Sequence, residues 1–195
     1  IDLAGTVINY DELEIRLYGL LLKKARLTSE AEQTDLNLPF SDELRVINLR
    51  KAEEEAYKAR KTELKTSKKI LNGQITQREQ DIKELEVQLL TLKSNLKLAK
   101  KRLDISNDLL TDQLTSPMEH LTIESEVESI LGDVRSTEEA LPRVRAALIE
   151  TIDRSKELSL RFSREAREAL GETELNIART EEEAVSPLLG LFLNW

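Results

Sequence analysis

Residues 101–120 read KRLDISNDLLTDQLTSPMEH, and they interrupt a chain that otherwise follows a helical pattern. The end of this stretch has the composition of a helix start. Ser116 suits the N-cap position, and Pro117 suits the first helical position, where a missing N–H costs nothing. Glu119 stands three residues after Ser116, which is the spacing of a capping box. A helix is therefore predicted to begin here, just after another has ended near Leu114.

The stretch lies between two heptad repeats, with nine apolar residues among eleven inner positions before it and nine among twelve after it. The inner positions before it are Ile75, Arg78, Ile82, Leu85, Leu89, Leu92, Leu96, Ala99, Leu103, Ser106 and Leu110. Those after it are Ile123, Val127, Ile130, Val134, Thr137, Leu141, Val144, Leu148, Thr151, Ser155, Leu158 and Phe162. Two such stripes bury one another most simply by folding back antiparallel. We predict an all-α fold, a long antiparallel coiled-coil helical hairpin.

The rest of the chain adds one shorter helix, which we expect to pack near the open end of the hairpin. Apolar residues recur at helical spacing from Tyr10, and Pro39 ends the pattern before Ser41 caps the next helix. The first nine residues are either a lead-in loop or the end of a strand. The predicted segments are a lead-in at 1–9, helices at 10–32, 41–114 and 118–184, a linker at 33–40, a turn at 115–117 and a tail of undetermined structure at 185–195.

The composition agrees with helices that meet along narrow seams. Charged residues make up 34% of the chain and aromatic residues only 4%, with six glycines and four prolines. This is the profile of long helices or coiled coil. So few aromatic side chains cannot fill a wide interior, so we expect an elongated molecule.

The charge and residue types exclude several functions. The net charge of -8 comes from 37 acidic and 29 basic residues, which we interpret as intermixed, and the absence of a basic stripe argues against nucleic-acid binding. No apolar run approaches the roughly 20 residues of a membrane span. The lack of cysteine removes disulfides, thiolate chemistry and zinc–cysteine sites.

The sequence offers no catalytic set. His120 is the only histidine, and we interpret it as a solvated surface residue. Carboxylates on thin helices lack a pocket that would shift their pKa or exclude water. We therefore predict a protein that is not an enzyme, with no catalytic residue, cofactor or metal.

Three residues near the turn form a candidate partner-binding site. Arg102, Leu109 and Ser116 are spaced by seven, as R-x6-L-x6-S. Arg102 and Leu109 each precede an inner position, so both lie on one flank of the seam, where they can face a partner. The plainer alternatives stay open: a solvated flank residue for Arg102, packing on the loop for Leu109 and an ordinary cap for Ser116.

This layout resembles the periplasmic adaptor proteins, or membrane fusion proteins, of tripartite transporters. The stretches NGQITQREQDIKELEVQL (72–89), AKKRLDISNDLL (99–110) and SREAREALGETELNIARTEEE (163–183) look most like the HlyD branch that serves type I secretion. The resemblance covers about residues 1–183. It departs at SPLLGLFLNW (186–195), where the family pattern continues into a strand that begins like SPVDG.

The resemblance implies a role and a set of partners. In that family a lipoyl-like β domain flanks the hairpin, and the adaptor joins an inner-membrane ABC transporter to a TolC-type outer-membrane channel. It implies that Arg102, Leu109 and Ser116 contact this channel and neighbouring adaptors in a ring of six. It also implies a periplasmic protein of a Gram-negative bacterium, anchored in the inner membrane by a segment outside this sequence, that exports a protein substrate.

The residues alone leave other classes open. A cytoplasmic coiled-coil scaffold would bind partner helices along its flank, and a regulatory arm of an enzyme would need a catalytic domain elsewhere. A membrane span upstream and strands on both sides of the hairpin would favour the adaptor, whereas a bare helical continuation would favour the scaffold.

Overall fold

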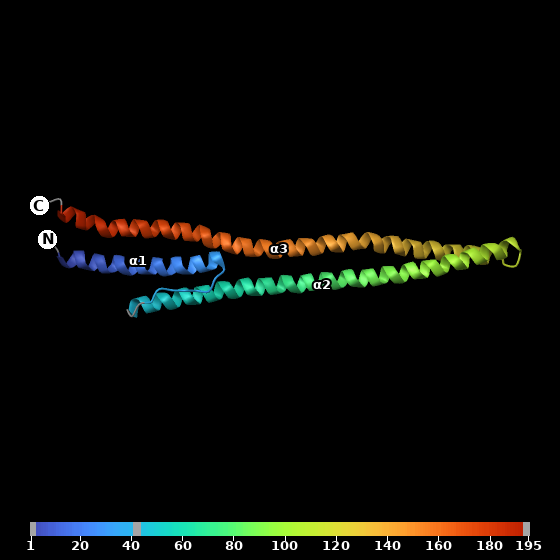
Figure 1. Cartoon of the computed structure of the whole chain (residues 1–195), viewed down its shortest axis with the longest axis horizontal. Coiled ribbons are helices and arrows are strands. Elements are labelled where there is room, and N and C mark those ends of the chain that lie inside the picture. Colours follow the sequence, from blue (N-terminus) through green and yellow to red (C-terminus); the bar gives the residue numbers. More distant parts are fainter. Residues whose placement is uncertain (1–2, 41–43, 193–195) are drawn as a thin grey trace. The chain divides into compact units, whose positions relative to one another are not determined.

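The computed structural model describes residues 3–40 and 44–192, which form three helices and no strand. They are α1 (Leu3–Glu32), α2 (Leu44–Thr111) and α3 (Pro117–Phe192), as Figure 1 shows. The predicted all-α fold with a long helical hairpin and one shorter helix is confirmed. None of the described helices has the length and apolar character needed to cross a membrane.

Several predicted boundaries are wrong. Residues 3–9 belong to α1 rather than to a loop or strand, since this stretch has no proline and joins directly to the helical pattern that follows. At the other end α3 continues through residues 185–192, so this part of the tail is helical. The turn occupies residues 112–116, because α2 ends at Thr111. Residues 41–43, predicted to start the second helix, lie outside the described residues.

The chain divides into two units, and α2 and α3 pass through both. Unit 1 comprises Ile1–Lys69 and Lys156–Trp195, and unit 2 comprises Ile70–Ser155. Unit 1 therefore holds α1, the first part of α2 and the last part of α3. Unit 2 is a two-helix hairpin that contains the turn.

Unit 2 is held together by the predicted seam. Every inner position from Ile75 to Ser155 is buried or half-buried, except Arg78, which is exposed and pairs with Asp81. Ion pairs cross between the helices beside the seam, from Lys93 to Glu138 and from Arg145 to Glu86, each at 2.7 Å. From Glu86 to Lys93 the residue number rises along α2, and the number of the partner on α3 falls from Arg145 to Glu138. The hairpin is therefore antiparallel.

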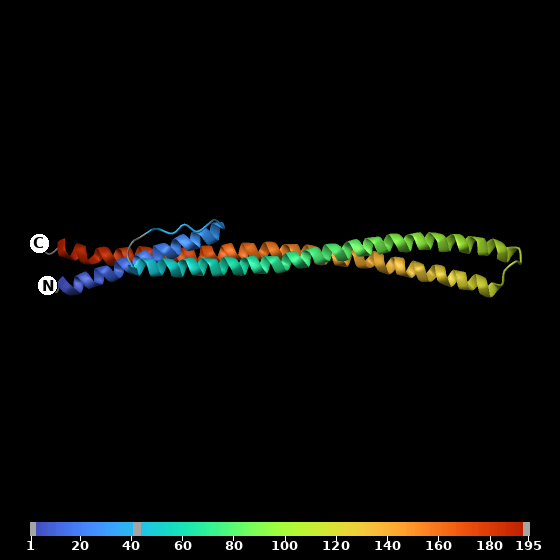
Figure 2. The same ribbon diagram turned by 90° about the horizontal axis from the view of Figure 1, so that it is seen from below.

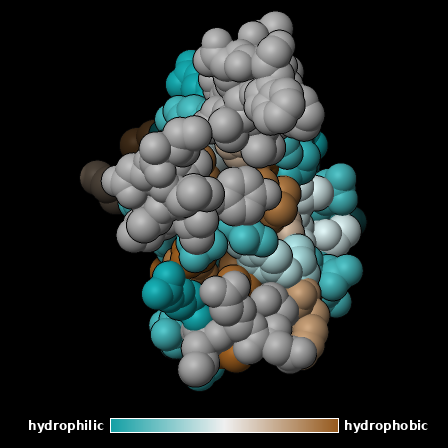
Figure 3. All heavy atoms as spheres, turned by 90° about the vertical axis from the view of Figure 1, so that its left-hand side faces the viewer, coloured by the Kyte–Doolittle hydropathy of each residue, from teal (hydrophilic) through white to brown (hydrophobic). Residues whose placement is uncertain are grey.

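Unit 1 is a three-helix arrangement in which α1 runs parallel to α2. Gly19 lies against Leu49, and further along Arg26 pairs with Glu53, so both helices advance in the same direction. Figures 1 and 2 show α1 beside α2 and α3, with the connecting segment returning along α1. In Figure 3, which looks onto the end of unit 1, hydrophilic residues line much of the right-hand side, and hydrophobic residues are visible both near the middle and at the lower edge. The small core joins α1, the linker and α2 through Leu22, Leu38 and Val46.

The predicted linker is extended from residue 34 and is tied to its surroundings by hydrogen bonds. The Tyr57 hydroxyl donates to the Thr34 carbonyl at 2.7 Å, and the Tyr18 hydroxyl donates to the Phe40 carbonyl at 2.9 Å. These bonds satisfy carbonyls that neither a helix nor a sheet would pair. They hold the linker along the helices, so that α2 can start beside α1 and run parallel to it.

A buried ion network also joins the helices of unit 1. Arg26 donates to Glu53 and, at 2.7 Å, to Glu30, whose side chain is only 1% exposed. Arg60 approaches the other Glu30 oxygen at 3.3 Å and also pairs with Glu165 on α3. Burial lowers the pKa of Arg26, but its hydrogen bonds to Glu53 and Glu30 outweigh burial and raise the pKa overall. The guanidinium therefore stays charged and counters Glu30.

Candidate functional site at the hairpin tip

The turn of the hairpin begins with a tightly bonded end of α2. Gln113 has a left-handed backbone, with φ of 61°. Its N–H donates to the Leu110 carbonyl at 3.1 Å, and the Leu114 N–H donates to the Leu109 carbonyl at 2.8 Å. This pair of bonds is a Schellman motif, in which glycine is the usual left-handed residue. We call residues 102–121 the tip.

Replacing Gln113 with glycine is expected to stabilise the tip by about 0.5–1 kcal/mol, because glycine adopts a positive φ without the steric cost that a Cβ brings. Alanine at the same position keeps the Cβ and serves as the control without this gain. Urea unfolding followed by circular dichroism measures the difference. Equal stability of the glycine and alanine variants would contradict this assignment.

The start of α3 follows the predicted cap with one difference. The Ser116 Oγ accepts a hydrogen bond from the Glu119 N–H at 3.2 Å, and the Ser116 carbonyl accepts the first helical bond from His120. Ser116 is therefore the N-cap. In a capping box the Glu119 carboxylate would accept from the backbone N–H of Ser116. Here it accepts instead from the Thr115 hydroxyl at 3.0 Å.

Replacing Ser116 with alanine should lower the stability of the hairpin by about 1 kcal/mol, because the cap is lost, whereas aspartate keeps it. Unfolding experiments on both variants measure this. Aspartate has a second use, because it preserves the cap while changing the surface. Normal stability with impaired partner binding in Ser116→Asp would assign Ser116 a contact role, and normal binding would leave it an ordinary cap.

Arg102 lies on α2 and faces its neighbour across the hairpin. Its Nη1 donates to both carboxylate oxygens of Glu126 on α3, at 3.2 and 3.0 Å. Its side chain is nevertheless 60% exposed, so the pair sits at the surface and contributes little to stability. The guanidinium has five N–H donors, of which those on Nη1 serve Glu126, so it retains donors for a partner.

Leu109 lies seven residues further along α2, about 10 Å at 1.5 Å per residue. It is 38% exposed, although it belongs to the last turns before the Schellman motif. Two neighbours that the sequence did not single out are more exposed: Leu114 at 73% and Met118 at 74%. Ile105 and Leu121 are also exposed. The signal that was missed is the density of Leu, Ile and Met at positions outside the seam.

The three predicted residues do not converge on a pocket. Arg102 and Leu109 share one flank of α2, and Ser116 lies in the turn, where its hydroxyl caps α3. What the structure brings together is an exposed apolar surface at the end of the hairpin, with Arg102 two turns below Leu109. Such a surface suits a protein contact.

The interpretation of His120 as a solvated surface residue is wrong. It is half-buried, and its Nδ1 lies 3.0 Å from the hydroxyl of Ser106, which is itself buried in the seam of α2. The pair links α2 to α3 beneath the exposed tip. The heptad placed Ser106 inside correctly, and an inner polar residue near the turn was the available sign that a neighbouring polar side chain would join it.

A separate hollow of about 410 Å³ lies between α2 and α3 in unit 1. Arg60, Phe162 and Glu165 are among its lining residues, and no histidine is. The Arg60 guanidinium stands over the Phe162 ring at 5.2 Å and pairs with Glu165. The charged groups that line the hollow thus hold α2 and α3 together. Among the described residues no group of three or more histidine or acidic side chains is placed to bind a metal ion.

Comparison with known proteins agrees with this geometry. The crystal structure of the soluble domain of LipC, a membrane fusion protein of a type I secretion system, superposes with a TM-score of 0.88. The two sequences are 15% identical, and the match covers 100% of this chain and 94% of that one. A search among curated proteins finds no match. The family model described as AprE, long alpha-helical hairpin, matches residues 7–186. Because that match spans most of the sequence, the protein belongs to the AprE long α-helical hairpin family.

Proposed function

We propose that the protein is the hairpin part of a periplasmic adaptor in a type I protein secretion system. In this role it bridges an inner-membrane ABC transporter to a TolC-type outer-membrane channel, and the hairpin tip makes the channel contact. The fold shared with LipC and the membership of the hairpin family support the adaptor role. The observation that carries the tip contact is the exposed apolar surface at the turn of an otherwise seam-packed hairpin.

Each predicted residue has a part in this contact. Leu109, together with the exposed Leu114 and Met118 of the same tip, offers apolar surface that leaves water when the partner binds. Arg102, which pairs with Glu126 at the surface, offers the remaining N–H donors of its guanidinium. The Ser116 hydroxyl accepts from Glu119 and retains its own hydrogen for a donor bond.

A single tip offers a small surface, so the proposal includes several copies acting together. Linked copies that engage one ring-shaped partner raise the effective affinity without any new contact. A ring of six adaptors, anchored in the inner membrane and surrounding an exported protein, is the arrangement we propose. The role is structural, and it requires no catalytic group.

One observation favours a second candidate, a coiled-coil scaffold that binds partner helices along its flank. Val87, Leu90 and Leu98 on α2, all before the tip in sequence, are exposed. A flank partner would cover them. The two candidates therefore differ in which leucine matters: the adaptor depends on Leu109, and the scaffold depends on Leu90 and Leu98.

The experiment that separates them measures binding of the full-length adaptor to its purified outer-membrane channel by surface plasmon resonance. Leu109→Asp and Leu90→Asp introduce the same charge on the same helix. The adaptor role predicts weakened binding for the first variant and unchanged binding for the second. Absence of any binding by the unmodified protein, or the reverse ranking of the variants, would reject the tip contact.

A further inference from the structure

Negative charge is concentrated around the tip. Residues 103–134 contain eight acidic residues and no lysine or arginine. Eight of the 37 acidic residues thus lie here, which leaves 29 to balance the 29 basic residues of the remaining sequence. The whole net charge of -8 therefore belongs to this one segment. The interpretation that acidic and basic residues are intermixed throughout the chain is wrong here.

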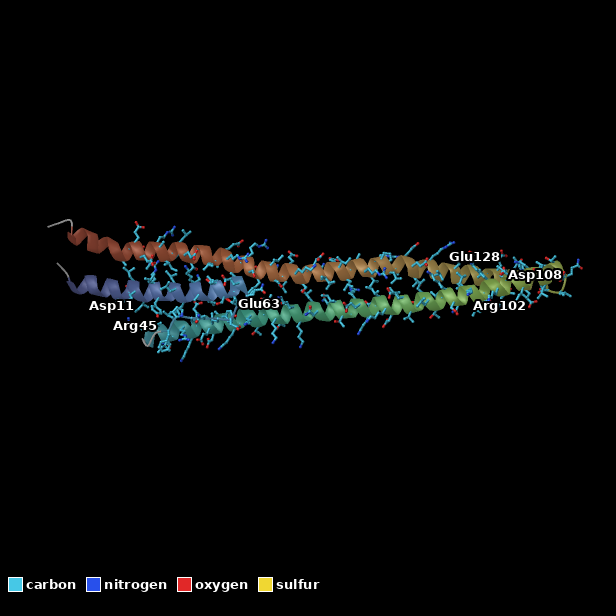
Figure 4. All side chains as sticks on the ribbon, in the orientation of Figure 1. Asp11, Arg45, Glu63, Arg102, Asp108 and Glu128 are labelled. Carbon is cyan, nitrogen blue, oxygen red and sulfur yellow. The ribbon has the colours of Figure 1, made fainter. Side chains whose placement is uncertain are left out.

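Part of this charge is neutralised within the hairpin. Glu126 on α3 pairs with Arg102, which lies just below the acidic segment on α2. Asp104, Asp108, Asp112 and Glu119 are all exposed, and in the described part of the chain no ion pair joins them to a basic side chain. Figure 4 shows Asp108 close to the turn, with Arg102 further back on α2.

The unneutralised carboxylates lie in the same turns as the exposed apolar residues. Asp108 and Asp112 flank Leu109 in sequence, and Glu119 follows Met118. A protein–protein interface usually has an apolar core that loses water and a polar rim that remains hydrated. The tip therefore has the chemistry of a docking surface whose rim is acidic.

The rim charge decides what can cover this surface. A second copy of the same tip would bring four more carboxylates against these four, and opposed like charges cost free energy. A membrane rich in anionic lipid would be repelled for the same reason. We infer that the tip docks into an apolar depression on a protein surface, with lysine and arginine facing Asp108, Asp112 and Glu119, while Arg102, two turns below Leu109, contacts that surface outside this basic rim. This inference rests on the proposed function, which makes that surface the periplasmic end of the channel.

The test removes three tip charges and compares the effect with the removal of three charges elsewhere. The tip variant carries Asp104→Asn, Asp108→Asn and Asp112→Asn in the full-length protein. The matched control carries Glu55→Gln, Glu79→Gln and Glu84→Gln, three exposed acidic residues of α2 outside the tip. Binding to the purified channel is measured between about 50 and 300 mM NaCl, a range over which the screening length falls to about half or less.

For the unmodified protein and the control, we expect affinity that falls as salt rises. For the tip variant, we expect about tenfold weaker binding at low salt and a flatter salt dependence, since attraction between the opposite charges is removed. Binding by the tip variant that equals or exceeds that of the control would overturn the basic partner while leaving the tip contact intact. Failure of the unmodified protein to bind at any salt would overturn both.

Discussion

Leu109→Asp in the full-length protein is expected to reduce secretion by about tenfold or more. The side chain is 38% exposed, and the change replaces this apolar surface with a charge. Loss of a hot-spot contact residue costs about 2 kcal/mol or more of binding free energy, and in the proposed ring the loss recurs at every tip. The new carboxylate would also have to enter an apolar depression. Exported substrate in the culture medium measures the effect.

Arg102→Asp tests the second side chain of the same flank. It is expected to reduce secretion less than Leu109→Asp, because a charged residue beside an interface contributes mainly to orientation and rate of encounter. The lost pair with Glu126 is exposed, so the fold should be retained. Leu90→Asp, at a leucine of α2 that is 70% exposed and lies outside the tip, is the control. Normal export from both tip variants would argue against any role for the tip.

Arg26→Ala is expected to destabilise unit 1 by about 2 kcal/mol. The substitution leaves Glu30, which is 1% exposed, with only the longer contact to Arg60 to counter its charge. Removing one partner of a buried pair is costly because the other charge stays buried. For a protein of this size, this corresponds to a fall in Tm of about 5 °C. Thermal unfolding followed by circular dichroism measures it.

Arg154→Ala is the matched control for this prediction. Arg154 pairs with Glu150 at 2.6 Å, also four residues apart on one helix, but both side chains are exposed. Its loss should cost less than about 0.5 kcal/mol. If the two alanine variants were equally stable, the buried network would contribute nothing beyond a surface pair, and its role in holding α1 to α2 would be rejected.

The hairpin could be predicted from the sequence because the heptad pattern that specifies its seam is repeated many times. Each heptad from Ile75 to Ser155 specifies the same seam, so an exception such as Arg78 does not change the result. The cap at Ser116 could also be predicted, since a serine followed by a proline is typical of the N-cap and first position of a helix.

Other features depend on contacts between distant residues, which a periodic pattern does not encode. The parallel course of α1 and α2 follows from bonds such as that from Tyr57 to Thr34, across 23 positions. The left-handed residue that ends α2 is a glutamine, so the usual glycine signal was absent. The buried Glu30 also looked like any other acid on a helix, because only the fold brings Arg60 towards it.

The central claim is that the tip touches the outer-membrane channel. A photo-crosslinking amino acid at position 109, in cells that are actively secreting, tests this most directly, with position 90 on the same helix as the comparison. We expect a crosslinked product with the channel from position 109 and none from position 90. Crosslinks to the channel from position 90 but not from position 109 would contradict the claim.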